Sequence, residues 1–271
     1  FRGYMRMKFF FTEVLRCFDL MLVQSQVDRD RFLTLGVDDS RILVTGSMKY
    51  DLQMNEPDGS GVSELFRLLG ISPESKIITC GSTWPGEEEI LLDAFKEVKY
   101  RHTSARLVLV PRHVERSGEI ETLIKSRGFE CLKWSALKGG DTVDKSSESV
   151  ILVDTTGELM QFYFIASLVF VGKSLCEHGG QNIIEPAALG KPIIIGPNMV
   201  NFRQVTADFL VAGALTQIGS PEEMKSAILK LLDDRGQAEV MGRRAFSLVE
   251  KKRALVRSSA GQVLKFIPSR S

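Results

Sequence analysis

The stretch from Leu168 to Ile195 reads LVFVGKSLCEHGGQNIIEPAALGKPIII and contains a complete strand-loop-helix-strand pattern. Leu168–Val171 is a continuous apolar run, which is typical of a strand covered on both faces. A polar, glycine-rich segment follows it, then a short helical pattern over Ile183–Leu189, and Pro192–Ile195 is a second apolar run. This order predicts a βαβ unit with two parallel strands.

The same alternation extends outward in both directions, and it predicts an α/β fold with a doubly wound, Rossmann-like parallel sheet. The predicted strands are Leu20–Gln24, Ile42–Thr45, Lys76–Cys80, Arg106–Val110, Val150–Val153, Leu168–Val171 and Pro192–Ile195. The predicted helices are Asp28–Leu35, Val62–Leu69, Glu87–Tyr100, Glu115–Ser126, Glu158–Ala166, Ile183–Leu189 and Phe202–Val211, followed by a mainly helical region from Pro221 to about Phe266 in which Gly236 and Gly242 are expected to mark turns or kinks.

Length and composition limit the classes of protein that fit. The 271 residues are enough for about two domains or one large α/β domain, and 44% of them are apolar, which excludes a disordered or fibrous chain. Thirty-five basic residues against 34 acidic ones leave a net charge of +1, so no chain-wide charge favours nucleic acid. No apolar run approaches the roughly 18 to 20 residues that a transmembrane helix needs.

The cysteines and histidines argue against a metal site. The four cysteines are far apart, without a CxxC pair, and we expect them to be reduced, buried and in the cytosol. The three histidines form no HExxH motif and no cluster with cysteine. We therefore expect no metal and no cofactor beyond the substrates themselves.

Composition also predicts a domain boundary. Asn55–Gly61 (NEPDGSG) has the composition of a linker, so we expect residues 1–54 and 55–271 to belong to different domains, while Gly139–Ser149 is predicted to be a loop. Residues 1–54 contain only two predicted strands, so we expect them to be the end of a domain that begins before Phe1. Phe1–Phe18 mixes basic and aromatic residues, which fits either a helix packed into a domain or one lying on an anionic membrane surface.

Four segments directly follow predicted strands, where ligands bind in open α/β sheets. Gly81–Thr83 offers Ser82 and Thr83, although a tight turn with a helix cap explains it equally well. Pro111 and Arg112 follow the next strand; a guanidinium there can bind a phosphate or pair with a nearby glutamate. Asp154–Glu158 includes Thr156, Gly157 and Glu158 at a strand-to-helix turn whose N–H groups could face an anion.

The fourth segment, Gly172–Pro186, carries the sharpest pattern. Gly179 and Gly180 would let the backbone approach a ligand, and a helix starting near Asn182 would direct its positive end at a phosphate. Glu177 and Glu185 have seven residues between them. In two-domain GT-B glycosyltransferases that use nucleotide sugars, the second carboxylate of such a pair binds the ribose hydroxyls.

Taken together, these motifs resemble the 3-deoxy-D-manno-octulosonic acid (Kdo) transferase family, a family of GT-B glycosyltransferases. The resemblance runs from about Leu15 to Phe209, with the motifs in the family's order. The motifs are Asp19-Leu20, Gln24-Ser25, Val44-Thr45-Gly46, Lys49-Tyr50-Asp51, Gly81-Ser82-Thr83, Gly86-Glu87-Glu88-Glu89, Leu109-Val110-Pro111-Arg112-His113, Glu115-Arg116, Asp154-Thr155, Gly157-Glu158-Leu159, Phe170-Val171-Gly172, Ser174-Leu175, Gly179-Gly180, Asn182, Glu185-Pro186-Ala187-Ala188, Gly190-Lys191-Pro192, Gly196-Pro197 and Asn201-Phe202.

The resemblance implies transfer of Kdo from CMP-Kdo to a lipid A precursor at the cytoplasmic face of a bacterial inner membrane, without a metal. It implies that residues 55–271 hold the CMP-sugar, and that no nucleic acid is involved. The nucleotide-binding residues that it implies are Pro111, Arg112, Thr156, Gly157, Glu158, Asn182, Ile183, Ile184 and Glu185, with Ser82, Thr83, Gly179, Gly180 and Gln181 as weaker candidates at the cleft.

Two residues depart from the family pattern: Gln181 stands where the family usually has His, and Lys173 where a second Gly is common. Gln181 cannot titrate, while Lys173 could add positive charge near the phosphate or point to solvent. The family's general base is a Glu in the first domain, which we expect upstream of Phe1, so no catalytic residue is assigned in this chain. Two alternatives stay open: a non-catalytic binding module, and a GT-B enzyme that uses a UDP-sugar.

Overall fold

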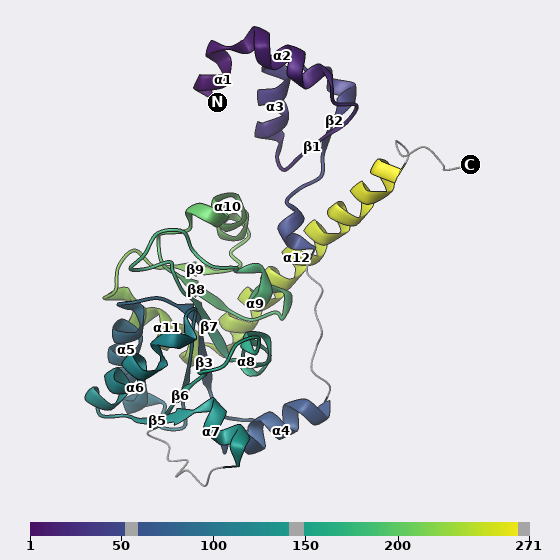
Figure 1. Cartoon of the computed structure of the whole chain (residues 1–271). Coiled ribbons are helices and arrows are strands. Elements are labelled where there is room, and N and C mark those ends of the chain that lie inside the picture. Colours follow the sequence, from purple (N-terminus) through teal and green to yellow (C-terminus); the bar gives the residue numbers. More distant parts are fainter. Residues whose placement is uncertain (52–58, 141–148, 265–271) are drawn as a thin grey trace. The chain divides into compact units, whose positions relative to one another are not determined.

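The computed structural model describes residues 1–51, 59–140 and 149–264 (Figure 1). They form two compact units, one of Phe1–Gln53 with Val249–Ser271 and one of Met54–Leu248. The sequence prediction assigned everything after residue 54 to the second domain. The compact units instead group the end of the last helix with the first residues of the chain.

The first unit is built around one βαβ element. Strands β1 (Met21–Val23) and β2 (Ile42–Val44) pair in parallel, with Met21 opposite Ile42. Helix α3 (Gln26–Thr34) connects them and begins at Ser25, whose side chain accepts a hydrogen bond from the backbone N–H of Asp28. This contact satisfies one of the free N–H groups at the helix start. Two 3-10 turns complete the unit, η1 (Asp39–Arg41) and η2 (Met48–Tyr50).

The first residues of the chain are helical, in α1 (Arg2–Arg6) and α2 (Lys8–Arg16). Phe9 is 85% exposed and Phe10 is 55% exposed, whereas the Phe11 ring packs on Tyr4 with centroids 4.7 Å apart. Helix α2 contains no buried residue. Among the described residues, no helix has the length and apolar character needed to cross a membrane.

The second unit contains a seven-stranded sheet in which all paired strands are parallel, which confirms the predicted α/β class. Its order is β5-β6-β4-β3-β7-β8-β9. The strands are β3 (Ile77–Thr83), β4 (Arg106–Pro111), β5 (Glu130–Lys133), β6 (Ser149–Leu152), β7 (Leu168–Val171), β8 (Ile193–Ile195) and β9 (Thr216–Gln217). The sequence analysis missed β5 and β9, which are the two edges.

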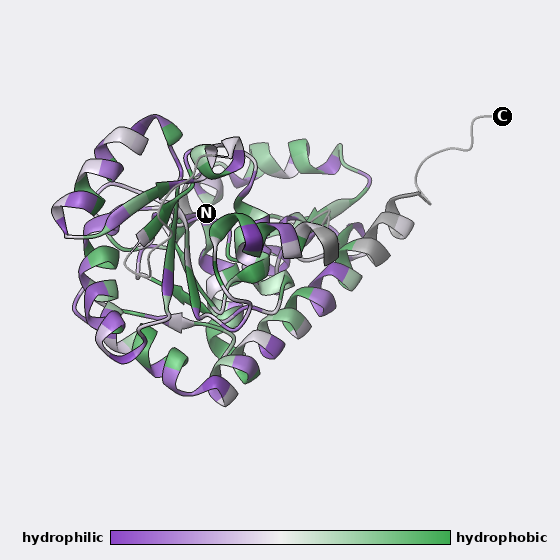
Figure 2. Cartoon of the chain, turned by 90° about the horizontal axis from the view of Figure 1, so that it is seen from below, coloured by the Kyte–Doolittle hydropathy of each residue, from purple (hydrophilic) through white to green (hydrophobic). Residues whose placement is uncertain are grey.

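Helices cover both faces of the sheet, as the apolar runs predicted (Figure 1). Helices α5 (Glu87–Arg101), α6 (Ser117–Ser126) and α11 (Glu223–Asp233) form a core with one face, through strand residues such as Ile78 and Leu107. Helices α4 (Gly59–Leu69), α7 (Trp134–Gly139) and α8 (Leu159–Ile165) pack on the other face against Ile77 and Val108. In Figure 2 much of the central strand region is green (hydrophobic), while the surrounding helices show both hydrophilic and hydrophobic stretches.

The remaining elements lie in connections between strands or after the last strand. They are the 3-10 turns η3 (Val114–Arg116) and η4 (Val200–Phe202) and the helices α9 (Ile184–Ala188), α10 (Arg203–Val211) and α12 (Arg235–Leu264). The predicted turns or kinks at Gly236 and Gly242 are found only in part: Gly236 is the second residue of α12, two residues after the break between α11 and α12 at Asp234, whereas no turn occurs at Gly242. Gly242 has a packing role: a Cβ there would lie 2.0 Å from the carbonyl oxygen of Gly190.

The four cysteines are free thiols, but the prediction that all of them are buried was wrong. Cys80 is buried in the sheet and Cys131 is half-buried, whereas Cys17 and Cys176 are exposed. The apolar runs beside Cys17 and Cys176 misled the prediction, because both residues lie in loops that follow those runs.

Candidate functional site

The centre of the sheet is its topological switch point. Strand β3 lies between β4 and β7, so the chain leaves β3 toward one side and later returns on the other. The loops that follow these three strands meet at the carboxyl edge of the sheet. The Gly172 N–H donates to the Gly81 carbonyl at 2.9 Å, and the Arg112 N–H donates to the Thr83 carbonyl at 3.1 Å. Ligands of open α/β sheets bind at such a point.

Backbone strain is concentrated in the two inner loops. Ser82 (φ 53°) and Lys173 (φ 55°) are the only non-glycine residues with positive φ in the described part of the chain. The loops approach so closely that a Cβ on Gly172 would lie 2.4 Å from the Ser82 carbonyl oxygen. Positive φ at residues other than glycine costs energy, and such residues gather at functional sites.

A buried carboxylate holds the loop after β7. Glu87, the first residue of α5, is fully buried. Its Oε2 accepts from the backbone N–H groups of Trp84 (3.0 Å) and Lys173 (2.9 Å), and its Oε1 accepts from those of Ser174 (2.9 Å) and Leu175 (3.0 Å). Burial raises the pKa of Glu87, and these four donors oppose that increase because they favour the charged form.

The adjacent carboxylate holds the loop after β4. Glu88 is also fully buried; it accepts a hydrogen bond from the Thr83 hydroxyl at 2.8 Å and pairs with Arg116 at 3.0 Å. Arg116 lies in η3 and also reaches Glu119 at 3.2 Å. The two carboxylates at the start of α5 therefore fix the loops on either side of β3. The sequence does not distinguish these two acids from Glu89, which lies on the same first turn and is exposed.

Aromatic and cationic side chains lie above these anchors. The Lys173 ammonium is 3.9 Å from the centroid of the Trp84 ring, and that ring makes a T-shaped contact with His113 at a centroid distance of 5.1 Å. The Trp84 indole N–H is buried and has no acceptor among the described residues. Trp84 thus connects the loop after β7 with the loop that carries Arg112. The sequence offered no signal for this contact beyond the presence of a tryptophan after a strand.

Arg112 and Glu185 lie on separate loops, and the positive charge of Arg112 acts on the Glu185 carboxylate. Arg112 is exposed, while Glu185 is half-buried at the start of α9. Burial raises the pKa of Glu185, and a 3.0 Å hydrogen bond from the Asn182 amide and the positive charge of Arg112 both oppose the increase. The Asn182 side-chain oxygen accepts from the backbone N–H of Ile184 at 3.1 Å. Ile183 and Ile184 have fully buried side chains.

The Asp154–Glu158 loop is tied to α7. The Glu158 carboxylate accepts from the Trp134 indole, the Lys138 ammonium and the Thr155 hydroxyl. Asp154 accepts from the backbone and side chain of Ser135, at 2.9 and 2.6 Å. Thr156 and Gly157 are exposed. Within this loop, Thr156 and Gly157 therefore stay open to a ligand, while the Glu158 carboxylate is engaged by the protein.

The weaker candidates at the cleft also differ in whether they are accessible or engaged by the protein. Ser82 is half-buried and strained, whereas Thr83 is buried on Glu88. Gly179 and Gly180 are buried, and a Cβ on Gly180 would lie 2.4 Å from the sulfur of Met199. The space that a side chain would fill at Gly179 and Gly180 is therefore occupied by neighbouring residues of the protein. Gln181 is half-buried beside them.

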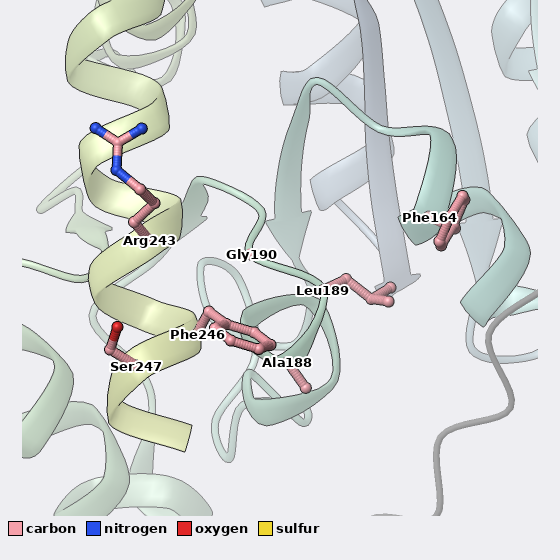
Figure 3. A pocket seen from close by; sticks show the side chains of 7 residues that line it. All are labelled: Phe164, Ala188, Leu189, Gly190, Arg243, Phe246 and Ser247. Carbon is pink, nitrogen blue, oxygen red and sulfur yellow. The ribbon is translucent and has the colours of Figure 1, made fainter. Parts of the chain in front are cut away.

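The clearest concavities of the second unit lie elsewhere. One pocket of about 470 Å³ is lined by Phe164, by Ala188–Gly190 and by Arg243, Phe246 and Ser247 of α12 (Figure 3). A second pocket of about 470 Å³ follows the starts of β3, β7 and β8, including Lys76 and Lys191. Both lie toward the amino ends of the strands, and neither contains a residue predicted to bind the nucleotide. Among the described residues, no cluster of three potential metal ligands occurs.

Comparisons with known proteins give the family. Residues 1–52 match the family model described as 3-deoxy-D-manno-octulosonic-acid transferase, and residues 145–247 match that of glycosyl transferases group 1. The chain is 31% identical to the Kdo transferase of Haemophilus influenzae over 88% of this chain and 55% of that protein. It is 30% identical to a bifunctional glycosyltransferase/methyltransferase of Fusobacterium nucleatum, over 87% and 36% respectively.

A solved structure agrees with these matches. The C-terminal CMP-Kdo binding domain of WaaA from Acinetobacter baumannii is 26% identical, with a TM-score of 0.64 over 70% of this chain and 96% of that domain. Two structures described as glycosyltransferases, from Rickettsia africae and Francisella tularensis, and one described as a UDP-N-acetylglucosamine 2-epimerase, from Listeria monocytogenes, share the fold at 14–17% identity. The chain spans about half the length of the curated Kdo transferases that it matches. It belongs to the Kdo transferase family of GT-B glycosyltransferases.

Proposed function

We propose that the second unit binds CMP-Kdo, and that the chain supplies the donor-binding half of an enzyme that transfers Kdo to a lipid A precursor, lipid IVA, in lipopolysaccharide biosynthesis. One observation carries the proposal: in a chain of this family, Arg112 and Glu185 follow β4 and β7 on the two sides of the switch point, and the charge of Arg112 acts on the Glu185 carboxylate. They are a cation and a hydrogen-bond acceptor on separate loops, and a nucleoside monophosphate needs both.

Each group has a definite task in this scheme. The planar guanidinium of Arg112 binds the CMP phosphate and stabilises the negative charge that develops on it as the bond to Kdo breaks. The Glu185 carboxylate accepts hydrogen bonds from the ribose hydroxyls, and Asn182 holds it in place. Pro111, Thr156 and Gly157 form the walls. Because fixed dipoles and a guanidinium carry the charge, the scheme needs no divalent cation.

The acceptor must lose a proton as its hydroxyl attacks the anomeric carbon of Kdo. By family resemblance the general base is a Glu of the first domain, and no residue of this chain is assigned that role. We therefore expect this chain by itself to bind the donor without transferring it. In the whole enzyme, the acceptor places the reaction at the cytoplasmic face of the inner membrane.

Calorimetric titration with CMP and UMP tests donor binding. We expect the chain to bind CMP more tightly than UMP, and Arg112→Ala and Glu185→Ala to weaken CMP binding about 10- to 100-fold, the usual range for a charge-assisted contact. Lys96→Met, an exposed change on α5, is the control. Equal affinity for CMP and UMP would instead favour an enzyme that uses a UDP-sugar.

A chimera tests transfer. This chain, joined to the part of the Haemophilus influenzae Kdo transferase that lies outside the match, is expected to transfer Kdo to lipid IVA, with or without chelator. A chimera that binds CMP-Kdo but transfers nothing, while the intact Haemophilus enzyme is active in the same assay, would favour a non-catalytic binding module.

A further inference from the structure

Lys173 is the cation of the site that the family pattern does not explain. It stands where a glycine is common in the family, and its backbone has a φ of 55°, which glycine adopts without cost. Its side chain has no carboxylate partner among the described residues. A strained residue with an unpaired charge at a switch point is a candidate for ligand binding.

The position of Lys173 is fixed from two directions. Its backbone N–H donates to the buried Glu87 carboxylate at 2.9 Å, and its carbonyl accepts from the Gly180 N–H at 2.8 Å. Its side chain lies along Gly179 and places the ammonium 3.9 Å from the centroid of the Trp84 ring. The ammonium is therefore preorganised and needs little reordering to bind an anion.

Trp84 connects the loop of Lys173 with the loop that carries Arg112. The Lys173 ammonium lies over the Trp84 ring, His113 makes a T-shaped contact with the same ring, and His113 directly follows Arg112 in the chain. The site thus has two cations on two loops, beside a buried indole N–H that lacks an acceptor. A nucleoside monophosphate presents one anionic group. A sugar acid joined to that phosphate presents a second one, because the carboxylate is attached to the same anomeric carbon as the phosphate oxygen.

We propose that Lys173, held on the Trp84 ring, binds the carboxylate of the sugar acid, while Arg112 binds the phosphate of the same donor. This inference rests on the proposed function and goes beyond it, because it assigns the sugar part of the donor to a residue of this chain. A compact ammonium suits a single carboxylate, while the forked guanidinium suits a phosphate.

Calorimetric titrations of the whole chain with freshly prepared CMP-Kdo, with CMP and with CDP-glucose test the assignment. We expect Lys173→Met and Lys173→Gly to weaken CMP-Kdo binding about tenfold, and to change the affinities for CMP and CDP-glucose less than twofold. Lys173→Arg should keep part of the preference for CMP-Kdo over CMP. Lys96→Met should change none of these affinities.

The contrary results are distinct. Equal weakening of CMP and CMP-Kdo would show that Lys173 binds the phosphate or supports the loop, and unchanged CMP-Kdo binding would show that it binds nothing; either result overturns the assignment. A chain that binds neither CMP nor CMP-Kdo would refute the proposed function, and this inference with it. Lys173→Gly removes the strained backbone, so a loss of binding in this variant cannot be attributed to misfolding if its melting temperature is unchanged or higher.

Discussion

Charged residues have different roles at the two ends of the strands of the central sheet, called here the amino edge and the carboxyl edge. At the amino edge, charged side chains pair with the ends of helices: Lys76 donates to the Leu232 carbonyl at 2.7 Å and contacts His102 at 3.1 Å, and His102 reaches Asp233 at 2.9 Å. At the carboxyl edge, the buried Glu87 and Glu88 hold loops, and Arg112 remains exposed. Two pockets of the second unit lie at the amino edge, whereas both strained non-glycine residues of the described chain lie at the carboxyl edge.

The largest expected effect on stability comes from removing the Glu87 carboxylate, which holds a loop at the carboxyl edge. Glu87→Ala would leave four backbone N–H groups without an acceptor, and we expect it to lower the free energy of unfolding by about 3–5 kcal/mol. Glu87→Gln keeps one acceptor oxygen and should lose roughly half as much. Urea denaturation measures both.

The neighbouring Glu89→Ala is the matched control, because Glu89 is exposed on the same turn and pairs with Arg127 only at 3.5 Å. Its effect should stay below about 0.5 kcal/mol. If all three variants unfold at similar urea concentrations, Glu87 does not hold the loop.

At the amino edge the largest effect comes from packing. Gly242→Ala places a methyl group 2.0 Å from the Gly190 carbonyl oxygen, so α12 must move away from that loop. We expect a loss of about 1–3 kcal/mol in the free energy of unfolding, although alanine is the better helix former. CMP binding should stay within twofold.

Gly236→Ala is the control in the same helix, because its Cβ would meet only Asp234 at 3.4 Å. We expect it to be neutral or to stabilise by up to about 1 kcal/mol. Loss of stability in both variants would point to the helix itself and not to the contact with Gly190.

A smaller effect is expected from Lys191, which precedes β8. Burial lowers the pKa of Lys191 to about 8, so between about pH 8 and its ordinary value of 10.5 the unfolded chain binds more protons than the folded one. The cost of burying the charge is therefore present below pH 8 and fades as the pH rises. Lys191→Met should stabilise the protein at pH 7 by about 1–2 kcal/mol, after allowance for partial exposure.

Urea denaturation of the wild type and of Lys191→Met at pH 7, 8, 9 and 9.5 measures the difference, which should shrink with rising pH. Lys96→Met serves as the exposed control and should show a constant difference. If the difference in free energy of unfolding between Lys191→Met and the wild type stays constant or grows as the pH rises, the lowered pKa of Lys191 is contradicted.

The smallest expected effect is a pH dependence of CMP binding that comes from Glu185. Because burial raises the pKa of Glu185 above its usual 4.5, the carboxylate is protonated at a higher pH than an exposed one. If the charged form binds the ribose, CMP affinity should fall severalfold as the pH is lowered from 7 toward that pKa. Titrations of the wild type and Glu185→Gln separate this effect from protonation of the CMP phosphate, which both proteins share. Parallel pH profiles would exclude a role for the Glu185 charge.

Much of the fold was predictable from residue type alone. The inner strands are continuous apolar runs, because helices cover both faces of the sheet. The edge strands β5 and β9 were missed because they are partly exposed. Their residues, Glu130–Lys133 and Thr216–Gln217, therefore do not form an apolar run. Helix α7 was missed because its six residues are too few to show a period.

Only part of the candidate site stood out in the sequence. Arg112 and Glu185 did so because polar residues after apolar strands are informative in α/β proteins, and their role in binding stays a prediction. Glu87, Glu88 and Trp84 did not stand out. Three acids at a helix start look alike in sequence, and only the packing of neighbouring loops decides which two are buried.

The sequence by itself determined the parallel α/β class and the family, because apolar runs and ordered motifs are local properties of the chain. Only the tertiary structure decided which edge holds strain, which carboxylates anchor loops and where the Lys173 ammonium lies. These features depend on contacts between segments about 90 residues apart, such as Glu87 with Lys173. Burial and charge pairing arise only when such segments meet.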